Sequence, residues 1–516
     1  MAFAKVFAAQ ITGLHGNIVR VEVDRTRGLH SFAIVGLPGQ AVEESRERVS
    51  AALKNSGYEN IKSQNQKITL SLSPSDLKKE GPYFDLAMAV ALLLSSGEMR
   101  AVTDGTVFVG ELSLDGSLRP ARGILPIAHE TKLAGFSCLV VPKENAEEAA
   151  LVEGLNVFGV KNIQEVVRAF ESGDFKYEPR SDSVYIQPHT SIDLADIRGQ
   201  ENAKRALVIA AVGGHNILMY GPPGGGKTML AKAFVGILPP LSKEAALAVT
   251  GIHSAAGNLH QKLIDYPPLR TPHHSSSYGA MIGGGTTPRP GEVTLAHKGV
   301  LFLDEFAEFD RRVIEALREP LEEGIVTIAR AKWSETFPSD FILIAAMNPC
   351  PCGFAGSTTK QCTCAPYDVA RYRKKISGPI LDRIDITFAV EPVRVEQLRA
   401  EISTDYKNGE TDTNRMTSEH CRLEIETIRE WQKQRLRSLG IHKENNAELS
   451  PKELAIVAPL SSDVQLLLEL SSTKLGLSAR AYHRVIRVAR TIADIDMEDK
   501  IKERHILEAL QYRPKL

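Results

Sequence analysis

The amino-acid sequence predicts an α/β protein of three parts: an N-terminal α/β domain, a central P-loop domain in which helices flank a parallel sheet, and a C-terminal helical domain. Three patterns support this prediction: mixed strand and helix periods early in the chain, a glycine-rich loop between an apolar strand and a helix, and helical periods alone near the end. At 516 residues the chain is too long for one hydrophobic core, and about 150 residues per domain gives about three domains.

The N-terminal part of the sequence contains both strand-like and helix-like patterns of apolar residues. Residues Ile18–Val23 alternate apolar and polar side chains, as in a strand with one buried face. Val42–Ser56 and Asp85–Leu94 have helical patterns instead. This mixture predicts an α/β domain.

The most informative segment is a P-loop. Asn216–Tyr220 predicts a buried strand and Met229–Leu238 a helix, so the glycines between them lie in a strand-to-helix turn whose backbone amides bind phosphate. Lys227 is expected to contact the outer phosphates of ATP, and the Thr228 hydroxyl to bind the Mg²⁺ that bridges them. The flanking elements and the Lys-Thr pair argue against a chance glycine-rich loop. The cofactor-binding residues of the loop are Gly221, Pro222, Pro223, Gly224, Gly225, Gly226, Lys227 and Thr228.

Polar groups that hydrolysis needs follow the next two apolar runs. Gly299–Glu305 has the pattern of a buried parallel strand with its chemistry at the carboxyl end. Asp304 is the expected magnesium residue and Glu305 the expected base that positions the attacking water; the alternative is that both acids cap the next helix. A third strand, Phe341–Met347, ends in Asn348, whose amide is expected to hold the attacking water or the terminal phosphate.

Four of the six cysteines form two C-x-C pairs directly after this third strand. In a reducing compartment such pairs favour metal over disulfide, and four thiolates suit a tetrahedral structural Zn²⁺ site. Free or redox-active thiols are the alternative. The candidate ligands are Cys350, Cys352, Cys362 and Cys364, whereas Cys138 and Cys421 are isolated.

Composition predicts neither a membrane protein nor a highly charged one. The net charge is −1 and 24% of the residues are charged, so any contact with DNA must come from local patches. The first residues do not form a signal peptide, and the longest apolar stretch, Leu86–Leu94, is too short to span a bilayer. We therefore expect a soluble cytoplasmic protein with no membrane partner.

Two polar stretches divide the chain. Glu171–Thr190 contains prolines and no apolar period, and Ala400–Thr417 is a second polar stretch. The predicted division is an N-terminal domain at residues 1–172, a linker at 173–190, the P-loop domain at 191–398 and the C-terminal domain at 399–516.

Helices fill the C-terminal part, and one of them carries an arginine face. Arg484, Arg487 and Arg490 share this face, and a solvated basic face is the expected arrangement for them. Arg480 also lies on it but begins the helix, where a lid-like domain would let it reach the γ-phosphate. The expected helices are Arg422–Leu439, Pro451–Leu460, Val464–Thr473, Ala479–Asp494 and Ile501–Tyr512.

The N-terminal domain resembles the Lon-protease type of domain, which has the S5 domain 2-like fold. In that family a catalytic Ser and Lys occupy the positions of Tyr83 and Leu125 here. Without this dyad no acyl-enzyme forms, so protease activity is the weaker hypothesis and a binding or oligomerisation role is expected. The resemblance rests on Lys79–Pro82, Phe108–Leu112, Gly123–Pro126 and Val141–Asn145.

Over nearly its whole length the chain resembles the AAA+ ATPases of the magnesium-chelatase-like group, and most closely the ComM/YifB family. The resemblance implies an inert Lon-like domain, a AAA+ module and a helical chelatase-type lid. It also implies a homohexameric Mg-ATP-driven ring that acts on single-stranded and branched DNA, as a branch-migration helicase during natural transformation. The motifs beyond the P-loop are Asp196–Gln200, Thr271–Ser277, Gly283–Gly285, Arg289–Glu292, Ala296–Phe306, Met347–Gly353 and Ser377–Asp385.

Two arginines match catalytic positions of this group. Arg383 matches the arginine finger, which would stabilise phosphoryl transfer in trans, in the neighbouring subunit's site. The alternative is a structural ion pair with Asp382 or Asp385. Arg480 matches the sensor arginine of the lid.

Two expected hairpins provide the link to DNA. One lies around Tyr278–Thr287 and the other uses Ile325–Ala329 as an arm. In similar rings such hairpins face the pore, where Arg330 and Lys332 would bind phosphates and Trp333 would stack on a base. The alternative for the second hairpin is a solvated turn with the tryptophan packed underneath.

Other functions stay open at this point. A chelatase-type protein-remodelling ATPase would need no DNA, and an ATP-dependent Lon-like protease would cleave protein. His273 and His274 stand together in one motif, where a structural or nucleotide-responsive role is favoured over metal binding.

Overall fold

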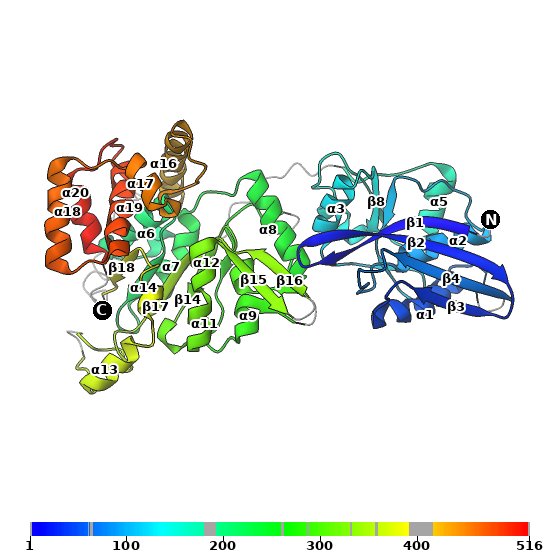
Figure 1. Ribbon diagram of the computed structural model, residues 1–516, viewed down its shortest axis with the longest axis horizontal. Helices are drawn as coiled ribbons and strands as arrows, with labels where there is room; N and C mark the ends of the chain where they lie inside the picture. Colours follow the sequence, from blue (N-terminus) through cyan, green and yellow to red (C-terminus); the bar gives the residue numbers. More distant parts are fainter. Residues whose placement is uncertain are drawn as a thin grey trace, which may run out of the picture. The chain divides into compact units, whose positions relative to one another are not determined.

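The computed structural model describes residues 3–59, 61, 65–179, 192–259, 263–285, 288–330, 333–356, 360–391 and 416–513 (Figure 1). The chain falls into two units, and each has its own sheet. The first unit contains Met1–Tyr185, Lys243–Ile264 and Gly285–Pro290, and the second contains Ile186–Ser242, Asp265–Gly284 and Gly291–Leu516.

The first unit is built on a seven-stranded mixed sheet. Antiparallel pairing of β1 (Phe3–Thr12) with β2 (His15–Arg27) lies near its centre. The alternating segment Ile18–Val23 is part of β2, and it buries Val21 and Val23 completely on the core face. The other strands are β3 (Ser31–Val35), β4 (Gln66–Ser73), β5 (Thr106–Phe108), β8 (Cys138–Pro142) and β9 (Asn156–Val160), in the order β3-β4-β2-β1-β5-β8-β9.

The two helices predicted for this unit are confirmed as α1 (Gln40–Asn55) and α2 (Asp85–Ser96). Helix α2 has apolar residues on nearly all of its faces, and nearly all of its residues are buried. It packs on β1 and β2. The unit also contains α3 (Ile124–Leu133), α4 (Ala146–Ala149), α5 (Ile163–Ser172), the 3₁₀ turn η2 (Lys143–Asn145) and the short strands β6 (Glu111–Leu112), β7 (Leu118–Arg119) and β13 (Arg289–Pro290).

Helix α8 (Lys243–Ala256) follows the P-loop in sequence yet belongs to the first unit. The Gly123 N–H donates to the Ser254 carbonyl at 3.0 Å, and the Ser254 hydroxyl donates to the Glu148 carboxylate. The Leu125 N–H donates to the same carboxylate at 2.8 Å, while burial raises the Glu148 pKa above its ordinary value. The sequence patterns do not indicate that this helix joins the other unit.

The first residues of the expected linker pack onto the first unit. Phe175 lies edge-on against Phe170, with ring centroids 4.9 Å apart. The rest of the linker, residues 180–190, lies outside the described residues.

The second unit contains a five-stranded parallel sheet in the order β11-β14-β17-β10-β18. The three predicted strands are confirmed as β14, β17 and β10. Tyr220 lies opposite Met347 and Leu303 opposite Ala345, so the carboxyl ends of these strands share one edge. A mixed α/β fold with such a core is consistent with a AAA+-like domain. The strands are β10 (Ile217–Tyr220), β11 (Leu269–Arg270), β14 (Val300–Leu303), β17 (Ile342–Met347) and β18 (Ile386–Ala389).

One of the two expected hairpins is confirmed. β15 (Ile325–Arg330) pairs with β16 (Trp333–Pro338) in antiparallel fashion. The hairpin predicted around Tyr278–Thr287 is wrong in its first half, because Tyr278–Ile282 forms helix α9, for which the Ser277 hydroxyl accepts the Ala280 N–H as an N-cap. Extended residues begin only at β12 (Gly283–Gly284), and residues 286–287 lie outside the described ranges.

The helices of this part cover the sheet and its loops. The helix expected after the P-loop is confirmed as α7 (Lys227–Ile237), which packs against α6 (Glu201–Gly213) and β17. The others are α10 (Glu292–Leu295), α11 (Arg311–Ala316), α12 (Arg318–Glu323), α13 (Pro366–Arg373), α14 (Gly378–Leu381), and the 3₁₀ turns η3 (Leu194–Asp196) and η4 (Phe306–Glu308).

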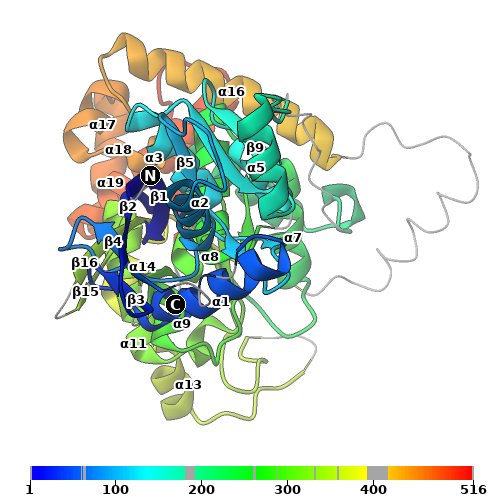
Figure 2. The same cartoon turned by 90° about the vertical axis from the view of Figure 1, so that its right-hand side faces the viewer.

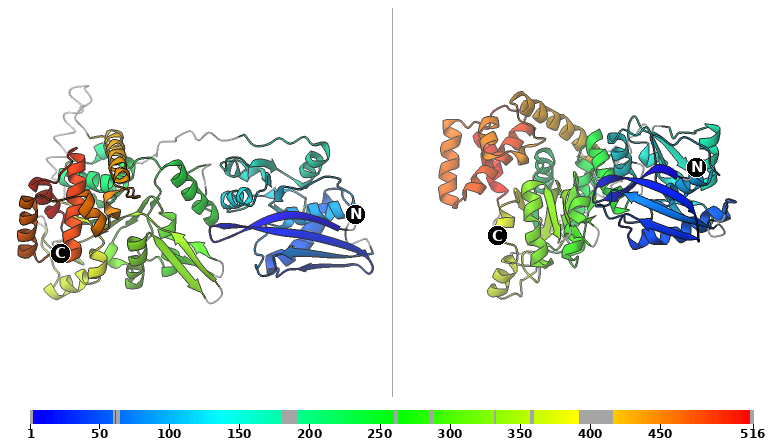
Figure 3. Two further views of the ribbon diagram at one scale, coloured as in Figure 1. Left: turned by 45° about the horizontal axis from the view of Figure 1, so that its top comes forward. Right: turned by 45° about the vertical axis from the view of Figure 1, so that its right-hand side comes forward.

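Helices alone make up the described part of the chain after residue 416, as predicted, and they gather in one cluster (orange to red in Figures 2 and 3). None of the helices in the described ranges combines the length and the apolar composition that crossing a bilayer requires. The helices are α16 (Ser418–Ser438), α17 (Pro451–Val457), α18 (Ser462–Leu475), α19 (Ala479–Ile495) and α20 (Glu503–Gln511), with the 3₁₀ turn η5 (Asn446–Glu448).

Beyond Arg480, the arginine face of α19 is not a solvated face, contrary to the sequence-based expectation. Arg490 is fully buried and donates to Asp494, one helical turn away, at 2.9 Å. Arg484 is also buried and donates to the Asp382 carbonyl, and Arg487 donates to a backbone carbonyl in the loop before α17. These side chains have polar partners inside the unit, so burial of their charge is compensated.

Asp494→Ala should destabilise the C-terminal helices by about 3–5 kcal/mol, because it leaves the buried Arg490 without its carboxylate. Urea unfolding of the full chain would be followed by Trp431 fluorescence in a Trp333→Phe background, since these are the two tryptophans.

The matched control is Glu424→Ala, which breaks the exposed pair with His420 and should change the unfolding free energy by no more than about 0.5 kcal/mol. Equal effects of the two substitutions would contradict the structural role of the buried pair.

Candidate active site

The P-loop occupies the turn between β10 and α7. Gly226 is the N-cap of α7 and has a φ of +87°, a left-handed conformation that favours glycine. A Cβ at Gly221 would lie 2.2 Å from the Val390 carbonyl oxygen, so the loop also requires glycine where it begins. The first N–H groups of α7 have no acceptor within the helix, which makes this turn a site for phosphate.

Lys227 lies at the centre of the loop and is largely buried. Its ammonium donates to the carbonyls of Gly221 and Pro222 at 2.8 and 3.0 Å, and to Asn348 Oδ1 at 3.2 Å. These acceptors are all neutral, and desolvation lowers the Lys227 pKa below its ordinary value. A buried cation with neutral acceptors favours an anionic ligand, so the site fits the phosphates of a nucleotide.

The two acids after β14 lie beside the loop. The Thr228 hydroxyl donates to Asp304 Oδ2 at 2.8 Å, which places both residues where they can hold one Mg²⁺. Glu305 is exposed and has a φ of +52°, and its N–H donates to Asp304 Oδ1 at 2.9 Å. The alternative expectation, that the acids only cap a helix, does not account for the contact with Thr228.

His274 contacts Glu305, a pairing that the sequence analysis did not predict. Its Nδ1 lies 2.9 Å from Glu305 Oε2, and its ring packs 4.1 Å from the ring of His273. The His pair follows β11, which neighbours β14 in the sheet, so both loops meet at the same edge. Predicting this pair requires the order of the strands in the sheet, which the sequence does not specify.

These groups line one cavity of about 750 Å³, within the size range of ligand sites. Its walls are formed by Pro223–Thr228, Thr271–His274, Asp304, Glu305 and Asn348, among others. Most residues predicted for the P-loop, the magnesium site and the attacking water therefore come together, and the His-containing loop lines the same cavity.

Arg383 and Arg480 are not among the residues that line this cavity. The Arg383 guanidinium contacts Glu322 and donates to the Pro379 carbonyl at 2.6 Å. Its acid partner is thus neither Asp382 nor Asp385, and its buried Nε has no acceptor among the described residues. Arg480 is exposed in the first turn of α19.

The β15–β16 hairpin presents Arg330 at its tip. Arg330 is exposed and lies opposite Trp333 in the strand register. Lys332 lies outside the described residues, and only the backbone of Trp333 is described. The exposed arginine leaves both hypotheses for this hairpin, DNA contact and solvated turn, as predictions.

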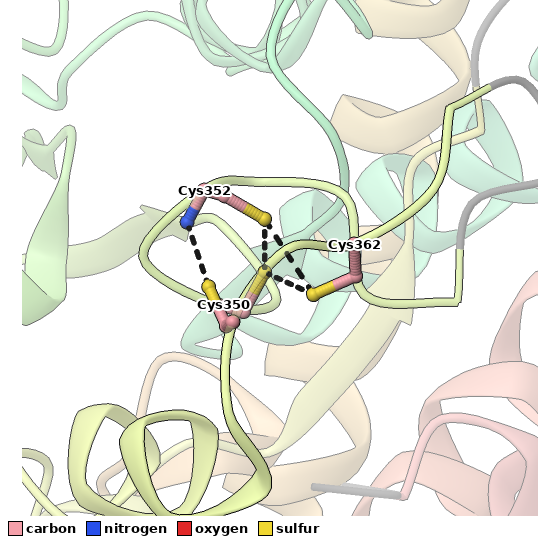
Figure 4. A group of neighbouring side chains, drawn as sticks. Cys350, Cys352 and Cys362 are labelled. Atoms are coloured by element: carbon pink, nitrogen blue, oxygen red, sulfur yellow. Dashed lines mark hydrogen bonds between the residues drawn. The ribbon is translucent and has the colours of Figure 1, made fainter.

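The two C-x-C pairs converge in the loop between β17 and α13. Figure 4 shows the sulfurs of Cys350, Cys352 and Cys362 turned toward one another. The Sγ atoms of Cys350 and Cys352 are 3.3 Å apart, and the two distances to the Cys362 sulfur are 3.7 and 3.5 Å. With Cys364, all four sulfurs lie within 4.8 Å of one another, so they can serve as ligands of one metal ion.

Tyr83 and Leu125, the residues expected at the positions of the Lon-type Ser and Lys, both lie in the first unit. Tyr83 is buried in an apolar cluster with Leu125, and burial raises the Tyr83 pKa above its ordinary value. The Tyr83 hydroxyl accepts a hydrogen bond from Arg122 at 3.4 Å. A protonated, buried phenol beside a leucine does not support acyl transfer.

Comparisons with known proteins cover most of the chain. Family models described as "Magnesium chelatase, subunit ChlI", "Subunit ChlI of Mg-chelatase" and "Magnesium chelatase, subunit ChlI C-terminal" match residues 193–398, 21–145 and 415–513. The uncharacterized protein YifB of Salmonella typhimurium is 40% identical over 515 residues, 99% of this chain and 97% of YifB. The competence protein ComM of Haemophilus influenzae is 39% identical over 520 residues, 99% of this chain and 98% of ComM. The magnesium-chelatase 67 kDa subunit of Chlorobaculum parvum is 30% identical over 164 residues, 31% of this chain and 23% of that subunit.

Lys227→Ala should weaken the binding of Mg-ATP by at least about 10-fold, because a hydrogen bond to a charged group contributes about 1.5–3 kcal/mol. Isothermal titration calorimetry on the full chain would measure the dissociation constant. The control is Lys452→Ala, which removes an exposed lysine of α17 and should leave affinity unchanged. Wild-type affinity in Lys227→Ala would contradict the role assigned to this side chain.

Proposed function

The chain belongs to the magnesium-chelatase-like family that includes YifB and ComM, and from this premise we propose that it is a Mg-ATP-dependent AAA+ ATPase that works on DNA as a homohexameric ring. The main support is the convergence of Lys227, Thr228, Asp304, Glu305 and Asn348 around one cavity. Nucleotide binding and hydrolysis need these residue types in this arrangement.

Each residue has a distinct role in the proposed reaction. The loop amides and Lys227 bind the phosphates, and Thr228 and Asp304 hold the magnesium ion, which neutralises phosphate charge when bound. Glu305 orients the attacking water and Asn348 contacts the terminal phosphate or that water. Because His274 lies 2.9 Å from the Glu305 carboxylate, it fixes the direction of this side chain in the pocket.

Arg383 is proposed to act in the neighbouring subunit's site. Arg383 does not line the cavity of its own chain, and its buried Nε has no acceptor among the described residues. In the ring it would exchange Glu322 for the γ-phosphate. Arg480 would approach the nucleotide from the C-terminal helices, which we propose to be a lid.

We propose the division expected from the sequence: a Lon-like domain at residues 1–172, a linker at 173–190, a AAA+ module at 191–398 and a lid at 399–516. The three family models match residues 21–145, 193–398 and 415–513, which lie within the first, third and fourth of these parts. Tyr83 and Leu125 support a non-catalytic role for the Lon-like domain. Binding or oligomerisation is the proposed role, and an ATP-dependent protease is the least supported function.

The DNA substrate rests on two supports. One relative at 39% identity is named a competence protein, and the hairpin presents an exposed Arg330. We therefore propose branch migration of recombination intermediates during natural transformation, with Arg330, Lys332 and Trp333 contacting the strand. The second candidate is a chelatase-type remodelling ATPase without DNA, which the match to a magnesium-chelatase subunit favours.

Movement of three-stranded and four-stranded DNA junctions in the presence of Mg-ATP tests the proposed substrate. Wild-type protein should convert the junctions to products, and Lys227→Ala should not, because phosphate binding is lost. Junctions that stay in place while ATP is hydrolysed would contradict branch migration. If, in that case, single-stranded DNA also leaves ATP turnover unchanged, the remodelling ATPase is favoured.

Arg383→Ala should lower ATP turnover by about 10³-fold or more while nucleotide still binds, because an arginine finger acts on the transition state. Arg437→Ala, an exposed arginine of α16, is the control. Mixing Arg383→Ala with Glu305→Gln should restore part of the turnover, since Glu305→Gln subunits supply Arg383 to intact sites. No recovery on mixing would contradict action in trans.

A further inference from the structure

The loop between β17 and α13 contains a compact sulfur cluster and a turn in which the Gly353 N–H donates to the Cys350 carbonyl at 3.0 Å. Its described residues form no helix or strand, and only Pro349, Cys350 and Gly353 among them are buried. A loop this polar and irregular cannot be fixed by an apolar core of its own.

The spacing of the four sulfurs matches one tetrahedral metal site. A zinc ion bound at about 2.3 Å by four thiolates places neighbouring sulfurs about 3.8 Å apart. The three sulfur–sulfur distances among Cys350, Cys352 and Cys362 are 3.3, 3.5 and 3.7 Å, and Cys364 belongs to the same group. All are far longer than a disulfide bond of about 2.05 Å.

Backbone N–H groups also point at the sulfurs. The Cys352 N–H donates to Cys364 Sγ at 3.4 Å, and the Ala355 N–H donates to Cys350 Sγ at 3.2 Å. Such donors stabilise thiolates and fix metal ligands from the outer shell. The isolated cysteines, Cys138 and Cys421, lie in hydrophobic clusters, and neither belongs to a group of possible metal ligands among the described residues.

The loop that carries the sulfur cluster contacts the nucleotide site at two points. Gly353 has a φ of +85°, and a Cβ there would lie 2.7 Å from Pro223 Cδ, so the loop packs directly on the P-loop. Asn348 stands two residues before Cys350 and accepts the hydrogen bond from Lys227. A metal that fixes this loop would therefore fix the Asn348 amide relative to the P-loop lysine.

We propose that Cys350, Cys352, Cys362 and Cys364 bind one Zn²⁺, and that this ion positions Asn348 against Lys227 in the nucleotide site. Zinc suits four thiolates in a tetrahedron and has no redox chemistry of its own, as a structural ion requires. Asn348 is then a contact residue of the nucleotide site, and the zinc acts through it.

Metal content of the full chain, purified without a histidine tag, is the first test. Plasma mass spectrometry should find about one zinc per chain, and Cys362→Ser/Cys364→Ser should lose most of it. Cys138→Ala/Cys421→Ala, which removes the two isolated thiols, should keep it. Absence of zinc in the wild type, iron in its place, or equal loss in both double variants would overturn the site.

A second measurement avoids dependence on folding of the variant. Titration of wild-type protein with an organomercurial reagent should release zinc in step with modification of four thiols, and cobalt substitution should give the intense visible bands of a tetrahedral tetrathiolate site. Mass mapping that finds a Cys350–Cys352 disulfide in freshly purified protein would overturn the proposal. These readouts do not use ATP hydrolysis, so their outcome is independent of the proposed function.

Coupling to the nucleotide site is tested by a cycle with Asn348→Ala. Zinc removal should weaken binding of a fluorescent non-hydrolysable ATP analogue, which keeps the terminal phosphate, by about 10-fold in the wild type, near the lower value for a hydrogen bond to a charged group. In Asn348→Ala, zinc removal should cost little more, because the contact is already lost. Equal losses in the two backgrounds would show that zinc does not act through Asn348.

Discussion

Parallel pairing of β14, β17 and β10 is the constraint on which the candidate site depends. Each strand is a short run of mostly apolar residues; β14 and β17 end directly before Asp304 and Asn348, and β10 ends directly before the P-loop. Because Tyr220 lies opposite Met347, the P-loop and Asn348 begin at the same height along the sheet. The register of β14 with β17 brings Asp304 to that edge as well. The site is therefore a consequence of strand register more than of any single loop.

The structural arginines of α19 and the lysine of the candidate active site differ in how their buried charge is compensated. Arg490 is fully buried but has a carboxylate and backbone carbonyls around it, so its charge is compensated within the chain. Lys227 is also buried, yet its acceptors are neutral oxygens. The difference explains why one cation stabilises a helix cluster and the other is suited to an incoming phosphate.

Local patterns predicted the strands and the P-loop, because a buried run followed by a glycine turn needs no knowledge of the rest of the chain. Contacts between distant segments were not predictable in this way. The pairing of His274 with Glu305 requires β11 beside β14, and the sequence does not specify strand order. Burial of Arg490 depends on Asp494, one turn later, and this pair was visible in the sequence as an i, i+4 spacing. The charge of the arginines indicated a solvated face, whereas residues of both this face and the apolar face of α19 are buried.

The three loops at the shared edge are held by different means. The loop after β10 runs straight into α7, so the helix fixes it, and the turn after β14 is fixed by the left-handed Glu305 and its hydrogen bond to Asp304. The loop after β17 has no helix among its described residues and contains a turn in which the Gly353 N–H donates to the Cys350 carbonyl, yet it carries Asn348, whose amide must lie within hydrogen-bond distance of Lys227. An irregular loop satisfies that demand only with a constraint of its own, and the four converging sulfurs, beginning at Cys350, provide one.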